Sequence, residues 1–89
     1  MAITHGMNVE EVKALGRKLQ TVSGELNSII GQLNSQVNST TWVGQDATTF
    51  KTQWWPDHQR HLKATADGLN GFGQSALNNA AAQEQASGR

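Results

Sequence analysis

Apolar residues recur along the first half of the chain at alternating steps of three and four. This spacing is typical of an amphipathic helix whose a/d heptad seam faces another helix. Asn8, with Glu10 and Glu11 behind it, provides an N-cap followed by acidic residues in the first turn. The pattern predicts one helix over about residues 8–39, with an interface or core seam formed by Val12, Leu15, Leu19, Val22, Leu26, Ile29 and Leu33.

A break in the pattern follows this first seam. Residues 38–41 are Asn, Ser, Thr and Thr, which favour caps and turns over helix interiors. Gly44 is able to take the positive φ that a chain reversal needs, and Asp46 is well placed to cap a following helix. We therefore expect a turn at about residues 40–45 and a second helix from about residue 46.

The second half carries a less regular seam, whose spacing slips after Trp54. Pro56 falls at the slip and lacks a backbone N–H, so a kink or local unwinding is expected near residues 52–56. Trp54 continues the spacing of Phe50 and is expected in the core, whereas Trp55 points about 100° further round and is expected to be more exposed. The seam residues predicted in this half are Phe50, Trp54, Leu62, Leu69 and Phe72.

Glycines loosen the end of the second helix, and no large apolar residue follows Leu77. We expect the helix to end near residue 77 and residues 78–89 to form a fraying or flexible tail. Two long helices joined by one tight turn lie antiparallel. Residues 1–89 are thus predicted to be a single all-α domain, an antiparallel two-helix hairpin whose exposed flanks require a second hairpin in a four-helix bundle dimer.

Charge, cysteine content and hydropathy argue against several kinds of binding partner and site. Seven basic residues balance seven acidic ones, so the chain lacks the electrostatic footprint of a protein that binds nucleic acid or anionic membranes. It contains no cysteine, which excludes disulfides and thiolate metal sites. The N-terminus lacks a basic run followed by an apolar stretch, and no window approaches the roughly 18 to 20 apolar residues of a membrane span.

Candidate chemistry is sparse. His58 and His61 share a helix face with only Asp57 near them, which falls short of a metal ligand set. The glycines of residues 68–73 are not followed by the Lys-Ser/Thr of a phosphate-binding loop, and no nucleophile–base arrangement is recognisable. We expect no catalytic residue, no metal, no cofactor and no small-molecule substrate.

The aromatic residues gather around the predicted turn, where Trp42, Phe50, Trp54 and Trp55 fall within fourteen residues. A large aromatic residue at a hairpin tip either closes the core or anchors a partner. The stretch Trp42-Val-Gly44-Gln-Asp46-Ala-Thr-Thr-Phe50-Lys-Thr-Gln-Trp54, central in a helical hairpin, resembles the WXG family of small ESAT-type proteins. These proteins are exported by type VII (ESX) secretion systems of actinobacteria and other Gram-positive bacteria, and the tail at residues 78–87 resembles actinobacterial members.

The resemblance implies pairing in the cytoplasm and export as a folded dimer without a cleaved signal peptide. Trp42 and Gly44 would then form one half of the family's export signal. The other half, Tyr-x-x-x-Asp/Glu in the tail, has no counterpart here because the chain contains no tyrosine. This favours a heterodimer with a paralogue whose tail reaches the secretion ATPase, with a homodimer using a divergent signal as the alternative.

Two other functions stay open at the level of sequence. In the first, the chain is a cytoplasmic hairpin adaptor and Trp42-x-Gly44 is only a turn. In the second, it is a membrane-active effector that makes lipid vesicles leak, at any pH or only in acid, where His58 and His61 gain protons.

Overall fold

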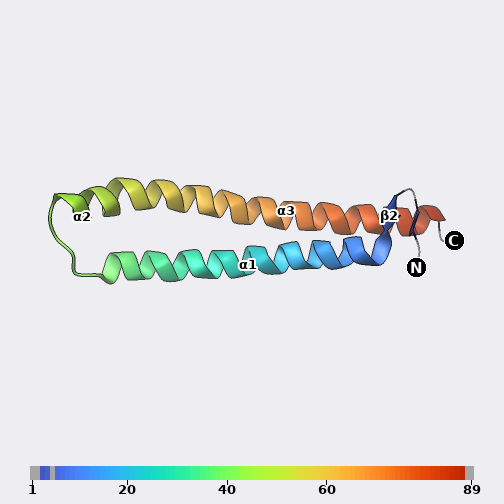
Figure 1. The fold of residues 1–89 in the computed structure, drawn as a ribbon, viewed down its shortest axis with the longest axis horizontal. Coiled ribbons are helices and arrows are strands. Elements are labelled where there is room, and N and C mark those ends of the chain that lie inside the picture. The colour runs from blue at the N-terminus through green and yellow to red at the C-terminus, as the bar shows by residue number, and fades with distance from the viewer. Residues whose placement is uncertain (1–2, 5, 88–89) are drawn as a thin grey trace.

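The structure, a computed structural model, describes residues 3–4 and 6–87. Helix α1 (Val9–Ser39) forms one arm, and α2 (Gln45–Thr49), the π-helical turn η1 (Phe50–Trp54) and α3 (Trp55–Ser87) follow one another in the second arm. The two arms lie side by side and run in opposite directions, so both termini lie at the same end of the molecule (Figure 1). The all-α hairpin expected from the apolar spacing is therefore the observed fold.

A short β-hairpin precedes α1 and was not expected from the sequence. Strand β1 (Ile3–Thr4) pairs antiparallel with β2 (Met7–Asn8), with Ile3 opposite Asn8 and Thr4 opposite Met7. Gly6 supports the reversal at φ 81°. Asn8 then caps α1 as predicted, since its side chain accepts a hydrogen bond of 3.1 Å from the backbone N–H of Glu11.

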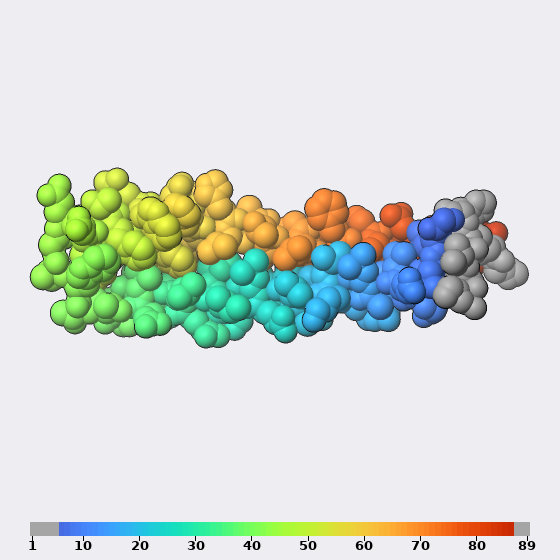
Figure 2. Space-filling view, viewed as in Figure 1, coloured from blue at the N-terminus to red at the C-terminus, as the bar shows by residue number. Residues whose placement is uncertain are grey.

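The hairpin is a thin rod of 65 × 16 × 14 Å (Figure 2). Its radius of gyration is 19.4 Å, whereas a compact chain of this length would have about 12 Å. Its accessible surface is 6114 Å², against about 5,100 Å² for a compact monomer of the same mass. A rod only two helices thick buries little apolar surface between its arms.

The two arms pack against each other along a line of buried residues at seven-residue spacing, most of which are small. The buried positions of α1 are Val9, Gly16, Ser23 and Ile30, and Ile30 is the largest side chain that is completely buried in the described part of the chain. Along α3, Ala66, Gly73 and Ala80 are buried at the same spacing. Such residues let helix backbones approach closely but contribute little apolar area.

The closest approach lies at Gly16 and Gly73. A Cβ atom placed on Gly16 would lie 2.8 Å from the carbonyl oxygen of Gly73, and one placed on Gly73 would lie 2.7 Å from the carbonyl oxygen of Gly16. Ser23 supports the next contact along the rod, because its hydroxyl donates a hydrogen bond of 2.6 Å to the carbonyl of Ala66. The two arms are therefore fitted to each other through backbone as much as through side chains.

The turn lies where the sequence placed it, but its cap differs. Thr40 ends α1, with its N–H 3.0 Å from the Gln36 carbonyl, and Gly44 precedes α2 at φ 119°. Asp46 was expected to cap the second helix; instead Gly44 occupies the N-cap position and Asp46 lies in the first turn. There the carboxylate still favours the positive end of the helix dipole.

The disturbance expected near Pro56 takes the form of η1. The N–H of Trp55 bonds the carbonyl of Phe50, five residues back, so one turn of the helix is widened by one residue just before the proline. Beyond it, α3 continues to Ser87, so the end predicted near residue 77 is too early. Alanines 80–82 sustain this last stretch because alanine has the highest helix propensity.

Candidate protein-interaction face

None of the predicted seam residues is fully buried between the arms. These residues lie beside the buried line of each helix, all on one long side of the rod, and they stay partly buried or exposed. Leu15, Ile29 and Leu33 are exposed on α1, and Phe72 is 71% exposed on α3. We call this surface the open apolar face; it consists of Val12, Leu15, Leu19, Val22, Leu26, Ile29, Leu33, Phe50, Trp54, Leu62, Leu69 and Phe72.

The opposite long side of the rod is held by polar pairs. Lys13 donates to the Glu84 carboxylate at 2.8 Å, and Gln20 donates to the Gln74 side chain at 3.3 Å. The hydrogen bond to Glu84 raises the pKa of Lys13 above its usual 10.5, against an opposing effect of desolvation. The two sides therefore differ in kind, since one is already paired within the chain and the other offers apolar side chains without polar partners.

The burial of Trp54 and Trp55 is the opposite of what the sequence predicted. Trp55 is 6% exposed, and its indole N–H donates to the Asn34 side chain at 3.0 Å, whereas Trp54 is 49% exposed. The prediction of a core Trp54 and an exposed Trp55 is therefore wrong. It assumed regular α-helical phase through Pro56, while the widened turn η1 changes the direction of every residue that follows it.

Aromatic rings continue the open apolar face toward the turn. The ring of Phe50 lies 5.7 Å from that of Trp42 and 5.1 Å from that of Trp54, and Trp54 stacks at 3.9 Å on the imidazole of His58. His58 Nδ1 lies 2.8 Å from the Trp54 carbonyl oxygen, which only accepts, so Nδ1 is the donor in this arrangement. Stacking and this hydrogen bond hold the row of rings in fixed positions.

An open groove of about 590 Å³ runs between the arms at this half of the face. Its floor and walls are almost entirely apolar, and it has the size of a site for several side chains of another helix. The residues that line it are Leu33, Val37, Phe50, Trp54, Trp55, His58, His61, Leu62 and Thr65.

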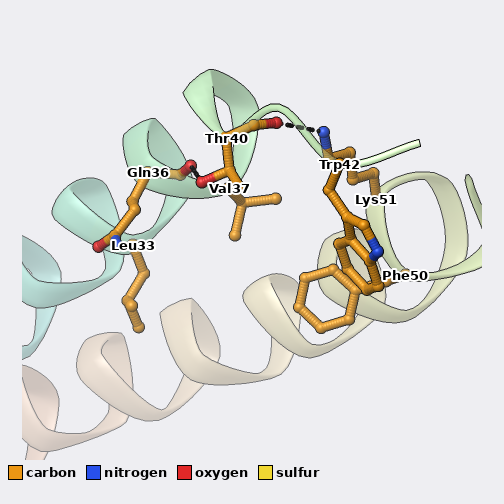
Figure 3. A pocket seen from close by; sticks show the side chains of 7 residues that line it. All are labelled: Leu33, Gln36, Val37, Thr40, Trp42, Phe50 and Lys51. Atoms are coloured by element: carbon orange, nitrogen blue, oxygen red, sulfur yellow. Dashed lines mark hydrogen bonds between the residues drawn. The ribbon is translucent and has the colours of Figure 1, made fainter. Parts of the chain in front are cut away.

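A second hollow of about 260 Å³ lies at the tip, between the end of α1 and the start of the second arm (Figure 3). Trp42 covers it from the turn, and Phe50 and Val37 reach it from the two arms. The ammonium of Lys51 donates to the carbonyl oxygen of Thr40 at 2.8 Å, which joins the second arm to the end of α1 across the turn. This hydrogen bond and the packing of Trp42 on Phe50 stabilise the tip, and Trp42 is still 45% exposed.

The structure offers little for chemistry in the described part of the chain. No group of three or more His, Asp or Glu side chains is gathered as a metal site among these residues, and His61 lies 3.8 Å from Asp57 with no further ligand type beside the pair. No helix in residues 6–87 is long and apolar enough to cross a lipid bilayer.

The sequence predicted the residues of the open apolar face as an interface or core seam, and the residues that close the hairpin were missed. The signal was present as small residues at seven-residue spacing, Gly16 and Ser23 before Ile30 in α1, and Ala66, Gly73 and Ala80 in α3. A pattern of large apolar residues does not include these glycine, serine and alanine positions. Comparison of the chain with protein-family models, with curated proteins and with solved structures finds no match.

Proposed function

We propose that this chain is a WXG-type hairpin that acts through protein contacts and not by catalysis. In this proposal it pairs with a second hairpin, a paralogue or another copy, to form a four-helix bundle in the cytoplasm. The pair then leaves the cell through a type VII secretion system without a cleaved signal peptide. The observation that carries the proposal is a half-exposed Trp42 at the tip of a hairpin whose one long side is apolar.

The pairing step is supported by what the hairpin leaves uncovered. Contiguous apolar surface along a whole helix pair is unfavourable in water, and covering it stabilises by about 25 cal/mol for each Å². The contact between the arms uses mainly small residues, so the large apolar side chains are still available. A second hairpin of similar length matches a rod 65 Å long better than a small globular partner would.

The tip supports the proposed role in export. Trp42 packs on Phe50 at 5.7 Å, the positive φ of Gly44 shapes the reversal, and the bond from Lys51 to Thr40 closes it. A side chain held in one position loses little conformational entropy on binding. Trp42 is thus presented to the tail of a partner or to the secretion ATPase in a ready-made arrangement.

The test compares two adjacent substitutions in an actinobacterial host with a type VII system. Trp42→Ala removes the half-exposed anchor, and Val43→Ala changes its neighbour, which is 87% exposed and touches no other part of the proposal. We expect Trp42→Ala to reduce the exported fraction at least about tenfold, as for loss of an aromatic anchor, while Val43→Ala leaves it unchanged. Cytoplasmic levels and circular dichroism of both variants should equal those of the parent chain.

Equal export of the two variants would remove Trp42 from the signal. A chain that is never found outside the cell, with the system active on its other substrates, would leave the hairpin as a cytoplasmic adaptor. Leakage of dye from lipid vesicles by the purified chain would instead indicate a membrane-active effector.

A further inference from the structure

The C-terminal end of α1 has no cation of its own. The last carbonyl groups of a helix lack donors within the helix and form the negative end of its dipole, so a basic side chain commonly lies near them. The last turn of α1 contains no basic residue. The backbone N–H and the hydroxyl of Thr40 both donate to the Gln36 carbonyl, which leaves the carbonyl of Thr40 itself to be paired from outside the helix.

The missing cation comes from the opposite arm. The ammonium of Lys51, in η1, donates to the Thr40 carbonyl oxygen at 2.8 Å across eleven residues of sequence (Figure 3). Within the described part of the chain, no other hydrogen bond joins residues 36–40 to residues 45–54, and residues 41–43 take part in none. The path of the turn between the two arms therefore depends on this one polar contact.

Trp42 lies directly beside that contact. It follows Thr40 by two residues, and its ring packs on Phe50, the residue before Lys51, with the ring centroids 5.7 Å apart. The side chains of Thr40, Trp42, Phe50 and Lys51 line the same hollow at the tip (Figure 3). The bond from Lys51 thus fixes the backbone that leads into Trp42, and Phe50 supports the ring.

We propose that Lys51 is the positioning residue of the tip, whose ammonium caps α1 from the second arm and so holds Trp42 in the orientation in which it is presented. The inference rests on the proposed function, because it assigns to Lys51 the control of the Trp42 anchor. Lys51 acts through Thr40 and Trp42, and this role needs no contact between Lys51 and a partner or the secretion ATPase.

The chemistry of lysine fits this role. Its apolar stem can lie along the hollow while its ammonium reaches a carbonyl, and a charged donor forms a stronger hydrogen bond than a neutral one. A single contact at a partly exposed site nevertheless contributes little to the stability of a whole chain. Its loss should therefore appear as local opening of the turn, with the hairpin as a whole almost unchanged.

Three variants isolate the contact. Lys51→Met keeps the length of the side chain but removes the charge and the donors, whereas Lys51→Arg keeps both. Lys63→Met is the matched control, because Lys63 belongs to the same arm, is exposed, and has no hydrogen bond or ion pair in the described part of the chain.

Limited digestion with chymotrypsin, followed by mass spectrometry, measures opening of the tip. Lys51→Met should raise the initial rate of cleavage after Trp42 by about 3- to 10-fold, as for the loss of one hydrogen bond, while Lys51→Arg and Lys63→Met stay within about twofold of the parent. Cleavage after Phe72, within α3, reports opening of the whole hairpin in the same digest and should change by less than about twofold.

Export from an actinobacterial host shows whether Lys51 acts through Trp42. Lys51→Met should lower the exported fraction by about 3- to 10-fold, and Lys51→Arg should restore it. In a chain that already carries Trp42→Ala, Lys51→Met should cause no further loss, because residues that act as a unit are not additive.

Three results would overturn the inference. Equal cleavage after Trp42 in Lys51→Met and the parent would mean that Lys51 does not hold the turn. A parallel rise in cleavage after Phe72 would mean that it stabilises the whole hairpin instead of the tip. A full additional loss of export in the Trp42→Ala background would mean that Lys51 acts independently of Trp42. Unchanged export of Trp42→Ala itself would refute the signal role in the proposed function, and the cleavage rates would still decide whether Lys51 holds the tip.

Discussion

The inner line between the two arms and the open apolar face differ in the size and burial of their side chains. On the inner line, Gly16, Ser23, Ala66 and Gly73 bring the arms together at backbone distance. On the open apolar face, large apolar side chains remain partly or largely exposed, as at Leu15 with 55% and Phe72 with 71%. Most of the large apolar residues thus lie outside the inner line, with Val9, Ile30 and Trp55 as buried exceptions.

This difference in side-chain size and burial bears on how much stability the isolated hairpin has. Small residues give close fit with little apolar burial, so an isolated two-helix rod is expected to be marginal. The large residues stabilise only when something covers them. Folding and pairing are therefore expected to be coupled, and substitutions should separate into those that open the inner line and those that weaken the face.

The largest effect is expected from the two tryptophans. Trp55→Ala removes a buried ring and its hydrogen bond to Asn34, which should lower the free energy of unfolding by about 3–5 kcal/mol and abolish most helicity. Trp54→Ala, from an exposed ring, should lower it by less than half as much and mainly weaken self-association. Urea unfolding followed by circular dichroism measures both free energies of unfolding. An equal decrease in the two variants would mean that buried and exposed tryptophans contribute alike to the stability of the hairpin.

The next effect distinguishes two glycines on α3. Gly73→Ala places a methyl group against the Gly16 carbonyl and should lower the free energy of unfolding by about 1–3 kcal/mol. Gly71→Ala meets nothing within 4 Å and should raise it by about 0.5–1 kcal/mol through helix propensity. Thermal unfolding of the two variants gives the sign directly, and stabilisation by both would show that the arms are not in close contact.

A smaller effect is expected at Ser23. Ser23→Ala removes the buried hydrogen bond to the Ala66 carbonyl and should lower the free energy of unfolding by about 0.5–1 kcal/mol. Ser35→Ala, at an exposed position of the same helix, should change it by a few tenths in the stabilising direction. Chemical denaturation resolves the difference, and identical behaviour would mean that the hydroxyl contributes nothing.

The smallest effect concerns the polar side of the rod. Because the pKa of Lys13 is raised by Glu84, the contribution of this pair is complete below the usual lysine pKa of 10.5 and is lost as pH rises through the higher folded value. Glu84→Gln should therefore lower the unfolding midpoint by about 1 °C between pH 7 and 9, because an exposed ion pair contributes little. The difference from the parent should vanish at strongly alkaline pH; a difference that grew there would contradict the assignment.

Much of the fold follows from local pattern, and the exceptions have physical causes. The spacing of leucines indicates α1, and the caps and Gly44 indicate the turn, since both depend on neighbours in sequence. The place of Trp54 and Trp55 could not be predicted because one widened turn before Pro56 changes the phase of the helix. The inner line was missed because small residues mark close backbone approach only when two helices are seen together.

The most direct test of the account is the unfolding midpoint measured across a hundredfold range of protein concentration. Coupled folding and pairing predicts a midpoint that rises with concentration, since mass action stabilises a folded pair but not a folded monomer. A midpoint that stays constant, with full helicity at the lowest concentration, would mean that the hairpin is stable with its apolar face uncovered. That result would contradict the coupling of folding to pairing.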